Sequence, residues 1–216
     1  MRYETIYFDL DGTLTDSGPG ITNSVAYALT RMGRPVPSRP SLNRYIGPPL
    51  WDSFRRYEAM TEAETQQAVA LFREYYEQRG KFENAVYSGI PALLQGLREG
   101  GKRLVVATSK PEVFALRIME HFGLARYFDH ICGAPMDNQE GAKKAAVIRD
   151  ALRRAGVEDL STAVMVGDRR HDIDGARQAG LEAVGVLWGY GDLQELEASH
   201  PVHIVESFDG LKRVLI

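Results

Sequence analysis

A chain of 216 residues, 44% hydrophobic and 25% charged, has room for one core with an inserted accessory unit, and its composition excludes a disordered protein. Its 26 basic and 29 acidic side chains give a net charge of -3, which argues against a nucleic acid polymer or an anionic membrane as partner. Because Cys132 is the single cysteine, an internal disulfide and a multi-thiolate zinc site are also excluded.

The N-terminal residues lead directly into an apolar stretch, without the apolar region of a signal peptide. No apolar run approaches the length that crosses a membrane. We therefore expect a cytoplasmic protein whose partner is a small molecule.

The first apolar run, residues 6–8, predicts a buried strand, and Asp9 and Asp11 follow it directly. Residues two apart on a strand point to the same side, so both carboxylates lie at the edge where ligands bind in an open α/β sheet. Like charges held so close repel, and a hard divalent cation, preferably Mg²⁺, is expected to neutralise them. A calcium-binding EF-hand is disfavoured because the preceding helix and the glutamate at the twelfth position are absent, and solvated turn acids explain the cluster poorly.

Residues 18–87 predict a helical insertion without a strand. Helical spacing is present at residues 21–32 and 61–80, and prolines between them indicate several helices joined by stiff turns. Thr61 and Glu64 have the spacing of a capping box for the second long helix. The predicted division is a core of residues 1–17 plus 88–216 and a helical unit of residues 18–87.

The next apolar run, residues 104–107, predicts a second buried strand, and Thr108 follows it. The residues from Thr108 to Pro111 are typical of a helix entry with proline in the first turn. Thr108 is therefore a candidate helix cap, a candidate anion contact, or both, since a helix start presents free amides to anions.

Later elements continue the alternation of strand and helix. Residues 147–155 have an apolar stripe that predicts a helix, and Lys143 and Lys144 precede it. Residues 163–166 and 183–187 predict two more strands. Alternating strands and helices predict an α/β fold, in which helices cover both faces of a parallel sheet.

Asp168 comes just after the strand at residues 163–166, and Asp172 and Asp174 lie at the start of a helical run at residues 173–179. Acids in the first turn of a helix are commonly partners of the helix dipole, and we assign Asp174 to that structural role. His171 has no second histidine at ligand spacing, which favours a surface residue.

The run Asp9-Leu10-Asp11-Gly12-Thr13, with Asp16 close behind, resembles the DxDGT first motif of the haloacid dehalogenase superfamily. Further motifs of that family match in order, namely Thr108 as the second, a lysine as the third, and Asp168 with Asp172 as the fourth. The resemblance covers essentially the whole chain, and the helical insertion is similar to the cap of the subgroup that includes phosphoglycolate phosphatases.

This resemblance implies a Rossmann-like parallel sheet core with an inserted all-α helical cap. It also implies a magnesium-dependent phosphomonoesterase in which Asp9 is the nucleophile that forms an aspartyl-phosphate. Asp11 is then the general acid and base, and its backbone carbonyl is a ligand of Mg²⁺. Asp9 and Asp168 bind the metal directly, and Asp172 acts as a further ligand through water or by orienting its neighbours.

The resemblance further implies that a lysine and Thr108 hold the phosphoryl group, with substrate contacts from Ser109 and Gly12. We favour Lys144 as this lysine because its position predicts the first turn of the helix, and we expect Lys143 to be solvated. The family's usual Lys-Pro pair is absent, so Lys143 stays an alternative. We expect Lys110 at the interface with the cap.

Substrate choice is expected to lie in the cap, where Arg44 precedes a Gly-Pro-Pro turn. Arg44 is either a clamp for a substrate carboxylate or second phosphate, or a surface arginine beside a turn. Family members that share the Gly-Pro-Pro-Leu stretch are known as phosphoglycolate phosphatases or 5'-nucleotidases. Phosphoglycolate, nucleoside monophosphates and sugar phosphates therefore all stay open as substrates.

Three other functions share this fold. Dehalogenases lack the second aspartate, so Asp11 argues against them. A phosphomutase of the β-phosphoglucomutase type returns the phosphoryl group to a sugar, and a non-catalytic regulatory module uses the same architecture. The sequence does not indicate an oligomeric state.

Overall fold

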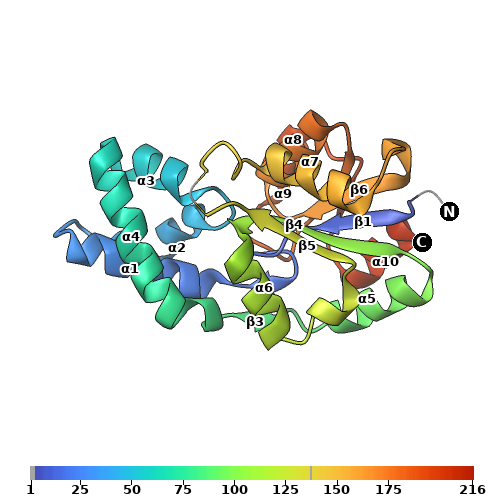
Figure 1. Cartoon of the computed structure of the whole chain (residues 1–216), viewed down its shortest axis with the longest axis horizontal. Helices are drawn as coiled ribbons and strands as arrows, with labels where there is room; N and C mark the ends of the chain where they lie inside the picture. Colours follow the sequence, from blue (N-terminus) through green and yellow to red (C-terminus); the bar gives the residue numbers. More distant parts are fainter. Residues whose placement is uncertain (1–2, 137) are drawn as a thin grey trace.

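The computed structural model describes residues 3–136 and 138–216, and it shows a parallel sheet with helices packed on both faces (Figure 1). A group of helices from the first half of the chain lies beyond one end of the strands, and the C-terminus lies at the opposite end of the molecule (Figure 1). The predicted α/β fold with a Rossmann-like sheet is thus confirmed. Within the described residues, no helix has the length and apolar character needed to cross a membrane.

The main sheet has the strand order β5-β4-β1-β6-β7-β8, and all neighbouring strands are parallel. The strands are β1 (Thr5–Phe8), β4 (Arg103–Pro111), β5 (His130–Ala134), β6 (Ala163–Gly167), β7 (Glu182–Val186) and β8 (His203–Val205). In the centre, Ile6 of β1 pairs with Leu104 of β4 on one side and with Val164 of β6 on the other. Because helices cover both faces, all side chains of β1 and β6 are buried, and such strands form unbroken apolar runs.

The four strands expected from apolar runs are present, but β5 and β8 were not predicted. The sequence of β5 includes a histidine and a glycine, and two of its five residues are only half-buried. Strand β8 has three residues, one of which is exposed. These outer strands are less covered than the central ones, so their sequences lack a long apolar run.

Helices on the two faces of the sheet pack onto two separate cores. One face carries α5 (Ile90–Glu99), α6 (Glu112–His121) and α10 (Phe208–Leu215), and the other carries α7 (Lys144–Ala155), α8 (Arg170–Ala179) and α9 (Leu193–Ser199). Alternation along β1 divides its side chains, since Ile6 and Phe8 belong to the first core and Tyr7 to the second.

The segment after β1 is largely helical, as predicted. It contains α1 (Gly18–Arg31), α2 (Arg39–Leu42), α3 (Leu50–Glu58) and α4 (Glu62–Gln78), with short 3-10 turns at Asn43–Tyr45 and Gly80–Phe82. Two further 3-10 turns, Ala125–Tyr127 and Leu160–Thr162, precede β5 and β6. The predicted capping box of α4 is confirmed, because Thr61 Oγ1 accepts a hydrogen bond from Glu64 N at 3.3 Å and Glu64 Oε2 accepts one from Thr61 N at 2.9 Å. Apolar residues of α1 and α4 join the first core.

Two short antiparallel strands, β2 (Thr15–Asp16) and β3 (Ala85–Val86), lie where the chain leaves the sheet and returns to it. The expectation of no strand in residues 18–87 is therefore wrong at Ala85–Val86, because two residues are too few to show a strand period. This pairing brings the two ends of the helical segment together. The division into a core of residues 1–17 plus 88–216 and a cap of residues 18–87 stays a prediction.

Candidate active site

Three central strands end at one edge of the sheet. Asp9 follows β1, Asp168 follows β6, and Thr108 lies near the end of β4. Strand β1 is the point from which the strand order runs both ways, to β4 and β5 on one side and to β6, β7 and β8 on the other. In open α/β sheets, such a switch point leaves a crevice at the carboxyl ends of the strands, where ligands bind.

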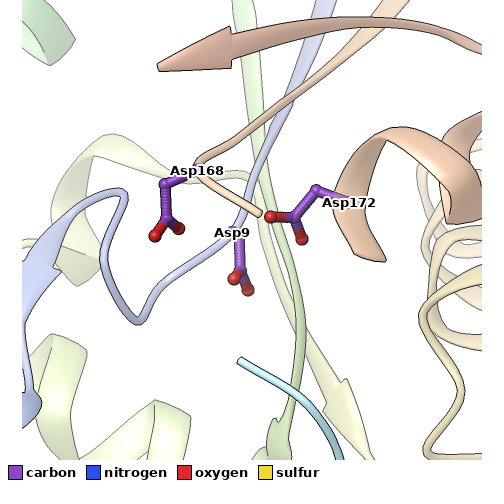
Figure 2. A group of neighbouring side chains, drawn as sticks. All are labelled: Asp9, Asp168 and Asp172. Carbon is purple, nitrogen blue, oxygen red and sulfur yellow. The ribbon is translucent and has the colours of Figure 1, made fainter. Parts of the chain in front are cut away.

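Asp9, Asp168 and Asp172 form one carboxylate cluster at this edge (Figure 2). One oxygen from each lies within 4.8 Å of the others, and the three residues are 2%, 0% and 1% exposed. Burial, together with the negative charges of Asp172 and Asp9, raises the pKa of Asp168. Burial also raises the pKa of Asp172, although the charge of Lys144 opposes that rise.

Lys144 lies in the middle of these carboxylates. It is the first residue of α7, and its Nζ lies 2.7 Å from Asp9 Oδ1 and 2.8 Å from Asp172 Oδ1. The Nζ also donates a hydrogen bond to the carbonyl of Ala107 at 3.1 Å. Burial disfavours the charged lysine, but the two carboxylates outweigh it and raise the pKa of Lys144. Lys143, in contrast, is exposed and pairs with Glu140 at 2.7 Å.

The cluster fits a hard divalent cation. Its donors are carboxylate oxygens, which Mg²⁺ prefers, and a single lysine leaves three buried acids only partly neutralised. Of the four predicted metal ligands, the structure brings the side chains of Asp9, Asp168 and Asp172 together. The carboxylate of Asp11 pairs with Lys110 instead, and the contribution of its backbone carbonyl to the metal site stays a prediction.

Asp11 is tied to the helical unit through Lys110. The Asp11 Oδ2 lies 2.9 Å from Lys110 Nζ, and that Nζ donates to Tyr76 Oη of α4 at 2.7 Å. Burial disfavours the lysine charge, but Asp11 and Tyr76 outweigh it and raise the pKa of Lys110. The expectation that Lys110 lies at the interface with the helical unit thus agrees with the structure.

Thr108 is buried within β4, and its Oγ1 accepts a hydrogen bond from Lys110 N at 3.2 Å. The prediction that residues 108–111 open a helix is wrong. Strand β4 continues to Pro111 with a register shift after Thr108, and α6 begins at Glu112. Thr108 is therefore not a helix cap, and among the described residues its hydroxyl has no acceptor, which leaves its proton free to donate.

Gly12 lies against the aspartate cluster. Its φ of 84° is in the left-handed region, and a Cβ at this position would lie 2.2 Å from Asp168 Oδ2. Its N–H donates to the carbonyl of Thr15 at 2.7 Å, so that amide is not free for the predicted substrate contact. The structure instead gives Gly12 the role of leaving room for Asp168.

Sequence reasoning missed the groups that hold Asp168. Thr13 Oγ1 donates to Asp168 Oδ1 at 2.9 Å, and Tyr190 N donates to Asp168 Oδ2 at 2.8 Å. Trp188 Nε1 donates to the carbonyl of Thr13 at 3.0 Å, and Tyr190 Oη donates to Asp16. A signal was present, because the run Trp-Gly-Tyr-Gly follows directly after a predicted strand, at the same edge of the sheet.

Arg44 is not brought to the cluster. Its guanidinium pairs with Glu58 at 3.1 Å and lies over the ring of Tyr57 at 4.5 Å, so it is engaged within the helical unit. The substrate contact, one of the two roles considered for Arg44, stays a prediction. A different arginine links that unit to the core, since Arg169 Nη1 donates to the carbonyl of Ile46 at 2.6 Å.

The neighbouring Asp174 and His171 lie outside the cluster. Asp174 pairs with Arg177 at 2.6 Å on α8, in agreement with a structural role. His171 is half-buried, and burial lowers its pKa to about 4, so it is neutral at physiological pH.

Comparison with known proteins gives one family. A family model described as haloacid dehalogenase-like hydrolase matches residues 6–186, from β1 to the end of β7.

Among the curated relatives, two examples are similar over nearly the whole chain. A 5'-nucleotidase of Pseudomonas aeruginosa is 42% identical, with 100% of this chain and 96% of the relative covered. A tyrosine-protein kinase, PtkA, of Mycobacterium tuberculosis is 43% identical, with 98% of this chain and 72% of the relative covered.

Among solved structures, a predicted phosphatase from Clostridium acetobutylicum superposes with a TM-score of 0.96 at 43% identity. The similarity covers 100% of this chain and 99% of that one. Both the sheet and the helical segment between β2 and β3 are therefore shared with a solved protein.

Proposed function

This chain belongs to the haloacid dehalogenase-like hydrolase family, and we propose that it is a phosphatase that hydrolyses a small phosphorylated metabolite through an aspartyl-phosphate on Asp9. The observation that carries the proposal is the position of the Asp9 carboxylate. It is buried at the ligand-binding edge of the sheet, 2.7 Å from Lys144 Nζ, and Asp11 follows two residues later. The proposed nucleophile thus lies beside a cation, and the proposed proton donor follows it by two residues in the chain.

In this proposal, a carboxylate oxygen of Asp9 bonds to phosphorus while the bond from phosphorus to the alcohol oxygen breaks. Asp11 gives a proton to the departing oxygen, and then takes one from the water that hydrolyses the acyl-phosphate. Support comes from Asp11 Oδ1, which is buried and has no hydrogen-bond partner among the described residues. The products are the alcohol and inorganic phosphate, and Asp9 is regenerated.

Lys144 and Thr108 are proposed to hold the oxygens of the phosphoryl group, with Ser109 beside them. Lys144 Nζ already lies between two carboxylates, and Thr108 has a hydroxyl proton free to donate. Both groups are buried, so their electrostatic effect on a bound phosphoryl group is only weakly screened.

We propose Mg²⁺ as the cofactor, held by Asp9, Asp168 and Asp172 together with the Asp11 carbonyl. When bound, the ion supplies positive charge that offsets the negative charge of the aspartates and the phosphoryl oxygens. Thr13 and Tyr190 orient Asp168 through its two oxygens, as partners of metal ligands commonly do.

Magnesium is expected to raise the melting temperature of the chain, and EDTA is expected to stop phosphate release from a panel of phosphorylated metabolites. An ion that binds only the native state stabilises it by roughly 2.7 kcal/mol at a concentration 100 times its Kd. Thermal unfolding and phosphate release are measured with and without Mg²⁺ for the wild type, Asp168→Asn and Asp174→Asn. Asp174 is the control because it is an aspartate of the same α8 region that pairs with Arg177 on the surface. An equal Mg²⁺-dependent rise in Asp168→Asn and the wild type contradicts the assigned site.

The mycobacterial relative is named a tyrosine-protein kinase, so transfer of the phosphoryl group to a tyrosine is an alternative to hydrolysis. Hydrolysis is favoured here because the chain covers 96% of the relative named 5'-nucleotidase but 72% of the relative named kinase. A phosphomutase or a non-catalytic regulatory module would release no phosphate in the same panel. Phosphoglycolate phosphatase-like and 5'-nucleotidase-like substrates, and the cytoplasmic location, remain predictions.

A further inference from the structure

Two cavities between the helical unit and the sheet reach the candidate active site. The first, of about 90 Å³, has Asp11 and Lys110 in its lining. The second, of about 510 Å³, has Lys144 in its lining. Ser109, Pro48 and Pro49 line both, so the two cavities adjoin.

The first cavity, which we call the aromatic chamber, is mainly apolar. Its walls include Tyr45, Trp51, Val69, Phe72, Tyr76 and Phe114. The rings of Phe72 and Tyr76 stack at 5.3 Å, and the ring of Phe114 meets Tyr76 edge-on at 5.4 Å. These contacts hold a continuous aromatic wall, and offset or edge-on ring contacts of this kind stabilise a further ring placed against them.

The charged groups of the aromatic chamber are already paired. Among the described residues that line it, the charged ones are Asp11, Arg73 and Lys110. Lys110 binds Asp11 at 2.9 Å, and Arg73 donates to the carbonyl of Met136 at 2.6 Å. A carboxylate or second phosphate in this chamber would therefore lose its water without gaining an unengaged cation, which is costly.

The second cavity has the opposite character. Its lining has four cations, Arg56, Lys143, Lys144 and Arg170, against the two acids Asp52 and Asp174, and its volume is the larger of the two. Basic side chains around an opening attract an anionic substrate toward the site. Asp11 does not line this cavity, so the group that receives the proton from Asp11 lies on the side of the aromatic chamber.

We propose that the aromatic chamber receives the leaving group, and that the substrate is a phosphomonoester whose alcohol carries an uncharged aromatic ring. This inference rests on the proposed function, because it places the departing oxygen at Asp11. The chamber would select an alcohol that carries an aryl or heteroaromatic ring, the class that includes nucleosides. It would disfavour an alcohol that carries a carboxylate, such as glycolate. Trp51, half-buried at the start of α3, is the specificity-determining residue.

The test compares three esters that share a phosphorylated primary alcohol, namely benzyl phosphate, propyl phosphate and phosphoglycolate. We expect kcat/KM for benzyl phosphate to exceed that for phosphoglycolate by about tenfold or more, since a buried unpaired charge is strongly disfavoured. Trp51→Ala is expected to raise KM for benzyl phosphate about tenfold and to leave that for phosphoglycolate unchanged, whereas Trp51→Phe retains the preference because it keeps a ring. Phe82→Ala is the matched control, because Phe82 is an exposed aromatic residue that does not line the chamber.

The outcomes separate this inference from the proposed function. Equal use of the three esters, a preference for phosphoglycolate, or an equal effect of Trp51→Ala on all three overturns the inference while hydrolysis itself stands. An unchanged preference in Trp51→Ala overturns it as well. No phosphate release from any ester by folded wild-type protein overturns the proposed function.

Discussion

Asp9→Asn is expected to lower the rate of phosphate release by at least about 10⁴-fold, because the amide cannot act as the nucleophile that accepts the phosphoryl group. The fold is expected to persist, since asparagine has the same shape and Lys144 keeps its partner Asp172 at 2.8 Å. Steady-state phosphate release in Mg²⁺ measures the activity, and thermal unfolding measures the fold.

The control for this change is Asp150→Asn. Asp150 is an aspartate of α7 that pairs with Arg153 and Arg154 on the surface, so its replacement is expected to leave the rate unchanged and the free energy of unfolding within about 0.5 kcal/mol. If Asp9→Asn keeps more than a small fraction of wild-type activity, Asp9 is not the nucleophile.

Lys144→Met is expected to cost about 3–5 kcal/mol of stability, because it leaves buried carboxylates without their cation. It is also expected to lower kcat by roughly 10²- to 10³-fold, the usual loss when one electrostatic contact to the reacting group is removed. The side chain of Lys144 is 4% exposed and contacts Asp9 and Asp172. Urea unfolding and phosphate release, each with and without Mg²⁺, measure the two effects.

The adjacent Lys143→Met is the matched control. The Lys143 side chain is 58% exposed and its partner Glu140 is 79% exposed, and such surface pairs contribute little to stability. Its replacement is expected to change stability by less than about 0.5 kcal/mol and to leave kcat unchanged. A larger loss of activity in Lys143→Met than in Lys144→Met contradicts the choice between the two lysines.

The centre of the sheet was predictable because its strands are covered on both faces. Strands β1 and β6 are buried at every position, and burial on both faces requires the apolar runs that the sequence contains. The acids that follow those runs, Asp9 and Asp168, stand out because charge directly after a buried strand is uncommon in a core. The spacing of Lys144 from the apolar stripe of α7 placed it in the first turn, where the structure has it.

Contacts between distant segments were not predictable from local patterns. Thr13, which holds Asp168 through a hydrogen bond, lies 155 residues before it in the chain, and no periodicity records such a pairing. The sequence left two roles open for Arg44, a substrate clamp or a surface arginine beside a turn, and it does not show that Glu58 lies 3.1 Å from Arg44. Residues 108–111 were predicted to open a helix for the same reason. They continue β4 because they pair with β5, and the sequence does not show that pairing.

Reductive trapping of the aspartyl-phosphate tests the central claim most directly. The wild-type protein is mixed with a hydrolysed substrate in Mg²⁺, quenched, treated with borohydride and digested, and the peptides are analysed by mass spectrometry. Borohydride reduces an acyl-phosphate to an alcohol, so we predict conversion of Asp9 to homoserine that depends on the substrate. Unmodified Asp9 during turnover, or reduction at a different acidic residue, would contradict the covalent mechanism.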